Sequence, residues 1–307
     1  MFTRPLRLGT RRSPLALIQA EEVRARLIAA HGWPESAIEL VTVLASGDRV
    51  QDRPLAEIGG KALWTKELDA ALLAGEIHFA VHSAKDIETL RPAEIVIGAV
   101  LERVDVRDVL VGAASIETLP PGARVGTSAP RRAAQLLNLR PDCVVVPFRG
   151  NVGTRLAKLA AGEADATLLA AAGLIRLGEH SVGTALDAGE WLPAPGQGAI
   201  AVECRASDAD TIAMLAAIDH PRSRAALLAE RALLAALGGN CHSAIGVLTT
   251  ASGECLTMRA ALFSLDGTER AEAEATFAAT DSTGPAELAK ALLAKASPAI
   301  TVHFTGP

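Results

Sequence analysis

The sequence Arg124-Val-Gly-Thr-Ser-Ala-Pro-Arg-Arg132 joins the end of an apolar strand, a turn of small residues and the start of a helix at Pro130. Proline is favoured at the first position of a helix. Free backbone N–H groups and the helix dipole make such a helix start attractive to anions. Arg131 and Arg132 lie in the first turn, where a cation is unfavourable by up to about 1 kcal/mol. The segment alone allows two interpretations, a pair of solvated arginines or an anion-binding site.

The same strand, turn and helix pattern recurs at Phe148-Arg-Gly-Asn-Val-Gly-Thr-Arg155, where Asn151 can cap the helix. It recurs loosely at Arg11-Arg-Ser-Pro14. Arginine suits a carboxylate ligand because its planar fork pairs with both oxygens. In open α/β folds, ligands gather beyond the carboxyl ends of strands. Three recurrences therefore favour a cleft that binds several carboxylates or phosphates.

Outward from these segments, apolar strands alternate with helices, which predicts an α/β fold with largely parallel sheets. The expected strands are 7–9, 38–44, 77–82, 95–101, 124–126, 143–148, 166–169 and 200–204. The expected helices are 14–30, 62–73, 130–139 and 151–161. The pattern restarts after residues 101–107, which we interpret as a hinge between two related lobes. The pattern alone does not fix the lobe to which strand 200–204 belongs.

A third region begins near residue 219 and has a different pattern. A helix is expected at 223–237, strands at 244–249 and 255–263, and a further helix at 285–295. We therefore expect a small α+β domain at 218–307. The first lobe is expected at 1–101 with a return segment at 197–217, and the second lobe at 102–196.

The composition is that of an ordinary globular protein of 307 residues, with 50% hydrophobic and 21% charged residues. A net charge of −5 argues against broad nucleic-acid binding. No signal peptide is recognisable, and the apolar runs are too short to span a bilayer. The four cysteines have no metal-type spacing. We expect a cytoplasmic protein with no metal, membrane or nucleic-acid partner.

Two further segments can carry chemistry. Lys85 and Asp86 end an apolar strand, where they form either a surface ion pair of little energetic value or part of the ligand site. An aspartate among ligand-binding cations stays ionised and can stabilise a cationic intermediate. Cys241 lies in the glycine-rich loop 237–246, so it is either a reactive thiol or a small apolar residue.

Taken in order, these segments resemble the porphobilinogen deaminase family, also called hydroxymethylbilane synthases. The resemblance covers nearly the whole chain, and its motifs are RLGTRRSPLAL (7–17), GGKALWTKEL (59–68), HSAKD (82–86), VGTSAPRR (125–132), FRGNVGTRL (148–156), AAAGLIRLG (170–178), LPAPGQGAIAVECR (192–205) and GGNC (238–241). No charged catalytic position of the family pattern is lost, although His242 and Asn240 depart from it beside the cysteine.

The resemblance implies two α/β lobes similar to periplasmic binding proteins and a third domain that carries the cysteine. It implies a monomeric transferase that joins four porphobilinogen molecules head to tail, releases ammonia at each step and yields hydroxymethylbilane. It also implies a dipyrromethane cofactor, made from substrate and bound to Cys241 by a thioether. Each porphobilinogen carries an acetate and a propionate, which explains arginines at strand ends in an acidic protein.

The resemblance also implies a role for each matching residue. Asp86 is the catalytic carboxylate, which stabilises the positive charge that forms on the pyrrole nitrogen when ammonia leaves. The implied cofactor ligands are Cys241, Ser13, Lys85, Asp86, Thr127, Ser128, Arg131, Arg132 and Arg155. The implied substrate-binding residues are Arg11, Arg149, Arg176 and Gln197.

Two other classes of function compete with this one. A non-catalytic protein that binds polyanionic small molecules would need neither Asp86 nor Cys241. A cysteine hydrolase would need a histidine and an orienting acid close to Cys241, and the sequence contains no recognisable signature for them.

Overall fold

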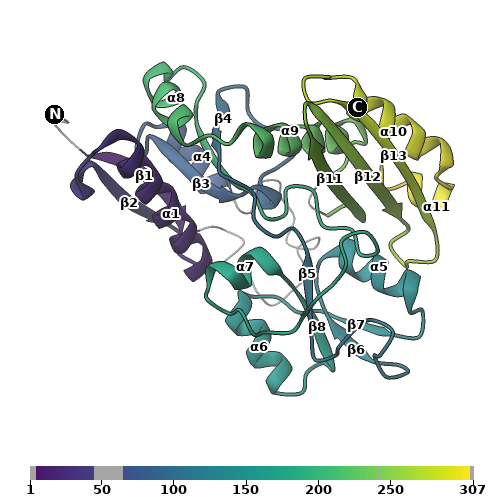
Figure 1. Cartoon of the computed structure of the whole chain (residues 1–307). Coiled ribbons are helices and arrows are strands. Elements are labelled where there is room, and N and C mark those ends of the chain that lie inside the picture. The colour runs from purple at the N-terminus through teal and green to yellow at the C-terminus, as the bar shows by residue number, and fades with distance from the viewer. Residues whose placement is uncertain (1–4, 45–64, 241, 305–307) are drawn as a thin grey trace.

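The computed structural model describes residues 5–44, 65–240 and 242–304. Within these ranges the chain forms three β-sheets with helices packed against them (Figure 1). Two five-stranded sheets define lobe 1 and lobe 2, and a three-stranded sheet defines the C-terminal domain. None of the helices in the described ranges is both long enough and apolar enough to cross a membrane.

Lobe 1 is built on a sheet with the strand order β2-β1-β3-β10-β4. Its strands are β1 (Leu6–Arg11), β2 (Ile38–Val43), β3 (Phe79–Ser83), β4 (Ile95–Val100) and β10 (Ile200–Arg205). Its helices are α1 (Pro14–His31), η1 (Glu35–Ala37), α4 (Lys66–Leu73), η2 (Ala84–Asp86), α8 (Ala209–Leu215) and η3 (Ala216–Ile218). The segment around β10 therefore returns to lobe 1 after the chain has passed through lobe 2.

Lobe 2 repeats this arrangement with the strand order β7-β6-β8-β5-β9. Its strands are β5 (Asp108–Val111), β6 (Arg124–Gly126), β7 (Val144–Val146), β8 (Ala166–Ala170) and β9 (Thr184–Ala185). Its helices are α5 (Pro130–Leu139), α6 (Val152–Ala160) and α7 (Ala171–Arg176). The two orders match position by position, which supports the interpretation of related lobes.

The expectation of largely parallel sheets is confirmed, because four of the five strands in each sheet run in one direction and a single strand runs against them. In lobe 1, β1 pairs in parallel with β2 and β3, whereas β10 runs antiparallel to β3 and β4. In lobe 2, β6 is parallel to β7 and β8, whereas β5 is antiparallel to β8 and β9. β5 and β10 are the strands that enter each lobe from the other one, so they arrive in the reverse direction.

Local sequence explains the helix starts that face the space between the lobes. Ser13 caps α1 by accepting a hydrogen bond from the backbone N–H of Ala16 (3.4 Å), and Pro14 occupies the first turn. Asn151 caps α6 in the same way through the N–H of Thr154 (2.9 Å). Both caps confirm the helix starts that the sequence predicts.

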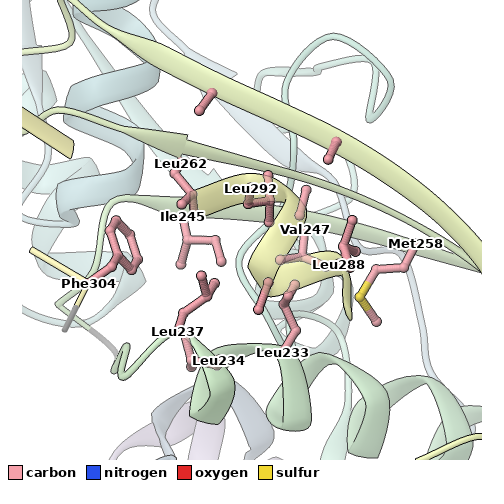
Figure 2. Packing of buried hydrophobic residues seen from close by; sticks show 14 of the residues in the cluster. Leu233, Leu234, Leu237, Ile245, Val247, Met258, Leu262, Leu288, Leu292 and Phe304 are labelled. Carbon is pink, nitrogen blue, oxygen red and sulfur yellow. The ribbon is translucent and has the colours of Figure 1, made fainter. Parts of the chain in front are cut away.

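The C-terminal domain packs two helices against one face of its sheet (Figure 2). Its elements are α9 (Pro221–Ala236), β11 (Ile245–Ser252), β12 (Cys255–Phe263), β13 (Arg270–Ala278), α10 (Gly284–Lys295) and α11 (Pro298–Thr301). Fully buried side chains of α9, β11, β12 and α10 form its core, including Leu233, Val247, Met258 and Leu292. The sequence analysis missed β13 but identified the other two strands and both longer helices.

Candidate active site

A cavity of about 780 Å³ collects side chains from both lobes and from the C-terminal domain. Lobe 1 contributes the start of α1 and the segment of η2, and lobe 2 contributes the starts of α5 and α6. The C-terminal domain contributes α9 and the loop that follows it. Predicted site residues that line this cavity are Arg11, Ser13, Lys85, Asp86, Ser128, Arg131, Arg132, Arg149, Arg155 and Gln197.

The described lining of the cavity is strongly cationic. Its cations are Arg11, Arg12, Lys85, Arg131, Arg132, Arg149, Arg155 and Arg231, and its carboxylates are Asp86 and Glu179. The eight cations outnumber the two carboxylates, so the cations repel one another unless anionic ligands bind there. The cavity is therefore suited to a ligand that carries several carboxylates.

Asp86 and Lys85 lie in η2, at the carboxyl end of β3. Asp86 Oδ2 is 3.7 Å from Arg11 Nη1, at the end of β1, so two neighbouring strand ends bring these side chains together. Burial and the charge of Arg132 lower the pKa of Lys85 to about 8, against the opposing effect of Asp86. Lys85 is therefore a cation whose charge depends on pH near neutrality.

The turn Pro195-Gly-Gln-Gly198 closes tightly over η2. Gly196 has φ +72°, and a Cβ atom at this position would be 3.0 Å from the backbone nitrogen of Lys85. Glycine is required because a side chain would be strained there and would push the turn away. The Gly196 N–H donates a 2.6 Å hydrogen bond to Glu230 of α9. The turn thus connects the active-site segment of lobe 1 to the C-terminal domain.

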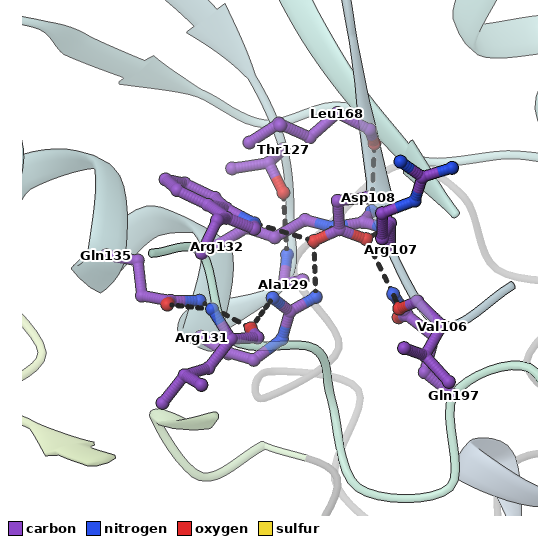
Figure 3. Close-up of polar contacts among 12 residues, drawn as sticks. Val106, Arg107, Asp108, Thr127, Ala129, Arg131, Arg132, Gln135, Leu168 and Gln197 are labelled. Carbon is purple, nitrogen blue, oxygen red and sulfur yellow. Dashed lines mark hydrogen bonds and ion pairs between the residues drawn. The ribbon is translucent and has the colours of Figure 1, made fainter. Parts of the chain in front are cut away.

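Arg131 and Arg132 are bound to one buried carboxylate, that of Asp108 at the start of β5 (Figure 3). Asp108 Oδ2 accepts from Arg131 Nη2 at 2.8 Å, and Asp108 Oδ1 accepts from Arg132 Nη2 at 2.7 Å. Burial opposes ionisation of Asp108, but the two guanidinium groups hold its pKa well below the usual range. The two arginines are 5% and 4% exposed, so their interpretation as solvated side chains is wrong.

Several buried polar atoms of the lining have no hydrogen-bond partner among the described residues. They are Ser128 Oγ, Arg131 Nε and Gln197 Oε1. Buried polar atoms are nearly always satisfied in proteins, so these atoms indicate a missing ligand or water. Two donors beside a cluster of guanidinium groups fit the carboxylates of a dipyrromethane, and the amide oxygen fits a pyrrole N–H.

Arg155 and Arg149 approach the cavity from the start of α6. Arg155 Nε donates to the backbone oxygen of Gly150 at 3.0 Å, which fixes the guanidinium beside the turn. Burial and the neighbouring charges of Arg132 and Arg149 together lower the pKa of Arg155 to about 10, so Arg155 remains a cation at neutral pH. Arg149 is 8% exposed and lines the cavity.

Three predicted site residues are not among the described residues of the cavity wall. Thr127 is buried and accepts a 3.2 Å hydrogen bond from the Ala129 N–H, so it shapes the turn before α5. Arg176 pairs with Glu22 of α1 at 3.3 Å, at the contact between the lobes. Cys241 lies outside the described residues, although its neighbours Asn240 and His242 line the cavity.

Two charged residues that shape this site, Asp108 and Arg231, were not predicted from the sequence. Asp108 holds the arginine pair, and Arg231 of α9 lines the cavity while donating to the Glu88 backbone oxygen at 2.7 Å. The available signal for Asp108 was a lone carboxylate at the start of an apolar strand, directly after the hinge. Arg231 shares its helix with two other arginines, Arg222 and Arg224, and nothing in the local sequence distinguishes it from them.

Comparisons with known proteins identify the same family along both parts of the chain. Residues 6–213 match the family model described as "Porphobilinogen deaminase, dipyromethane cofactor binding domain", and residues 225–297 match "Porphobilinogen deaminase, C-terminal domain". The porphobilinogen deaminase of Sphingopyxis alaskensis is 57% identical over 98% of this chain and 96% of its own length. That of Paracoccus denitrificans is 51% identical over 90% of each chain.

Among solved structures, the periplasmic molybdate-binding protein of Azotobacter vinelandii matches 73% of this chain and 97% of its own. The two sequences are 16% identical, and the TM-score is 0.38.

Proposed function

Because this chain belongs to the porphobilinogen deaminase family, we propose that it is a transferase that joins four porphobilinogen molecules head to tail. Ammonia leaves at each step, and the product is the linear tetrapyrrole hydroxymethylbilane. The observation that supports this most directly is the cavity with eight cations and with Asp86 in its wall. Each pyrrole unit carries two carboxylates, so a growing chain brings the negative charge that this wall requires.

The residues around the cavity fit the dipyrromethane cofactor of this family. We assign its carboxylates to Ser13, Lys85, Ser128, Arg131, Arg132 and Arg155, and its thioether to Cys241, with Thr127 shaping the turn. When bound, the cofactor supplies the primer to which pyrrole units are added. Ser128 Oγ and Arg131 Nε support this assignment, because they are donors without a partner among the described residues and belong to side chains that line the cavity.

Asp86 is the catalytic carboxylate in this proposal. Loss of ammonia from porphobilinogen leaves a positive charge on the pyrrole nitrogen, and a fixed carboxylate stabilises that charge as it develops. Arg11, 3.7 Å from Asp86, holds the carboxylate in place. Partial burial strengthens the interaction, since the local dielectric is lower than that of water.

The remaining cations bind substrate carboxylates. Arg149 lines the cavity at the turn before α6, and Gln197 lines it from the turn 195–198. Arg176 is assigned to the growing chain by family resemblance alone, because Glu22 is its partner here. We further propose that the protein acts as a cytoplasmic monomer, by family resemblance.

The test is the intact denatured mass of the purified protein after incubation with porphobilinogen. We expect a covalent excess of two pyrrole units, and further units in the presence of excess substrate. The matched control is Cys241→Ala, which should stay unmodified. An unmodified wild-type protein that still binds porphobilinogen would overturn the proposal and favour the non-catalytic binding protein.

A further inference from the structure

Asp108 is the point at which the two arginines of the proposed cofactor site meet the hinge. It is 0% exposed, and its two oxygens accept five hydrogen bonds from side chains (Figure 3). Arg132 donates two of them, through Nε at 3.2 Å and Nη2 at 2.7 Å. Arg131 donates one, at 2.8 Å. A single carboxylate therefore fixes the plane of both guanidinium groups.

The other contacts of the two arginines leave few orientations open. Arg131 Nη1 donates to the Leu192 oxygen at 2.8 Å, and Arg132 Nη1 donates to the Leu168 oxygen at 2.8 Å. Arg131 thus keeps only Nε without a partner among the described residues, and this atom is buried at the cavity. The hydrogen bonds to Asp108 determine where this donor points.

The charges of these groups also indicate that Arg131 and Arg132 depend on Asp108. Two guanidinium groups beside each other repel, and a single carboxylate between them leaves a net charge of one positive unit. Burial lowers the pKa of Arg131, so the site is already costly for a cation without its partner. Asp108 reduces this cost while leaving an attraction for further carboxylates. A second acidic residue would cancel that attraction.

The chain crosses between the lobes twice, first at residues 101–107 and again in the segment between β9 and β10. The remaining donors to Asp108 come from this second crossing. Trp191 Nε1 donates at 2.8 Å, and Gln197 Nε2 donates at 2.8 Å. Gln197 Nε2 also donates to the Val106 oxygen, on the first crossing, at 2.8 Å. Asp108 itself directly follows the first crossing. Both crossings are therefore joined at the carboxylate that orients the arginines.

We propose that Asp108 is a positioning residue that holds Arg131, Arg132 and Gln197 in the orientations that bind the dipyrromethane. Asp108 also connects these three side chains to the hinge between the lobes. This inference rests on the proposed function. Asp108 does not touch substrate in this scheme, because it is fully buried behind the arginines. Its effect is transmitted through the geometry of their donors.

The primary test is the rate at which unmodified protein acquires the two-pyrrole cofactor, followed by intact mass. In Asp108→Asn, an NH2 group takes the place of one carboxylate oxygen. A donor then faces the guanidinium groups where an acceptor stood. We expect loading to slow by about 10- to 100-fold, the range found when an orienting partner of a metal ligand is lost. Asp165→Asn is the matched control, because Asp165 pairs with Arg124 in lobe 2 outside the described cavity lining. It should load at the wild-type rate.

A second variant covers the case in which Asp108→Asn does not fold. Trp191→Phe keeps a buried aromatic ring but removes the indole N–H donor to Asp108, together with the volume of the second ring. We expect about tenfold slower loading, as for loss of one hydrogen bond to a charged group. Wild-type loading in a folded Asp108→Asn, or in Trp191→Phe where Asp108→Asn does not fold, would overturn the positioning role. Failure of the wild-type protein itself to load would instead overturn the proposed function, so the two failures are distinguishable.

Discussion

Arg176 at the end of α7 in lobe 2 pairs with Glu22 of α1 in lobe 1, with 3.3 Å between Nε and Oε2. Its Nη2 also donates to the Gly198 oxygen at 3.4 Å. The Arg176 side chain is 6% exposed and that of Glu22 26%, so the pair is shielded from most of the solvent. An arginine assigned to substrate by resemblance thus spans the contact between the lobes in this structure.

Comparison of Glu22→Gln with Arg176→Gln separates a role in substrate binding from a role in lobe contact. If Arg176 binds the growing chain, Arg176→Gln should slow the addition of later pyrrole units, and Glu22→Gln should not, because it leaves the guanidinium available. The measurement is the mass ladder of enzyme species with one to four added units. Equal effects of both variants, with no further loss in the double variant, would assign Arg176 to the ion pair alone.

Replacing Asp86 by Asn should abolish most turnover while the fold is retained. The side chain is partly exposed and pairs with Arg11 at 3.7 Å, so we expect little stability to depend on it. Loss of a group that stabilises charge in the transition state typically costs about 10²- to 10³-fold in kcat. Product formation by the loaded enzyme is the measurement, with thermal unfolding as the control for folding. Near-normal kcat would rule out the catalytic role.

The strand and helix units of both lobes could be predicted because their signals are local. A cap such as Ser13 or Asn151 and a proline in the first turn identify a helix start without tertiary information. The direction of β5 and β10 was not predictable in this way, since it depends on how the chain crosses between lobes. Strand β13 was missed because its buried face includes Ala271 and Ala273, which give a weak strand signal.

The residues of the candidate site divide in the same way, into those with a local signal in the sequence and those that only the fold brings together. Residues next to turns, such as Arg131 and Arg155, were predicted because their position beyond a strand end is visible in the sequence. Asp108 was not, because its role arises from donors 23 to 89 residues away that only the fold brings together. The contact of Arg176 was not predictable from local pattern, since its partner Glu22 is 154 residues distant.

Arg149→Ala should stall growth of the pyrrole chain. Arg149 is 8% exposed and lies in the cavity wall at the turn before α6, where a carboxylate of an incoming unit can reach it. We expect enzyme species with one or two added units to accumulate and release of tetrapyrrole to fall at least about tenfold, as for loss of one charge-assisted contact. Arg124→Ala, an exposed arginine of the same lobe, is the control. An unchanged ladder would remove Arg149 from the site.

Leu233→Ala should destabilise the C-terminal domain without changing the chemistry. Leu233 is 0% exposed in the core of Figure 2, so truncation leaves a cavity and should cost about 2 to 5 kcal/mol. Leu228, on the same helix, is 43% exposed, and Leu228→Ala should change stability by less than about 0.5 kcal/mol. Denaturant unfolding measures both. A KM change in folded Leu233→Ala at low temperature would mean that this core also shapes the site.

Lys85 should make the folding stability of the cofactor-free protein depend on pH. A lysine is charged below its pKa, and burial with the nearby charge of Arg132 lowers this pKa from 10.5 to about 8. Between these values the unfolded chain binds more protons than the folded one, so stability should rise with pH from about 8 to 10.5. The measurement is denaturant unfolding of Cys241→Ala, which keeps the site free of cofactor, with and without Lys85→Met.

The binding of cofactor carboxylates, unlike stability, should weaken as pH rises. As pH rises through about 8, Lys85 loses the charge that attracts the cofactor, so wild-type loading should slow relative to Lys85→Arg. The guanidinium of that variant keeps its charge throughout this range. The ratio of the two loading rates cancels the effect of pH on the thiol of Cys241, because that thiol is common to both proteins. A ratio that stays constant from pH 7 to about 9 would show that Lys85 does not contact the cofactor carboxylates.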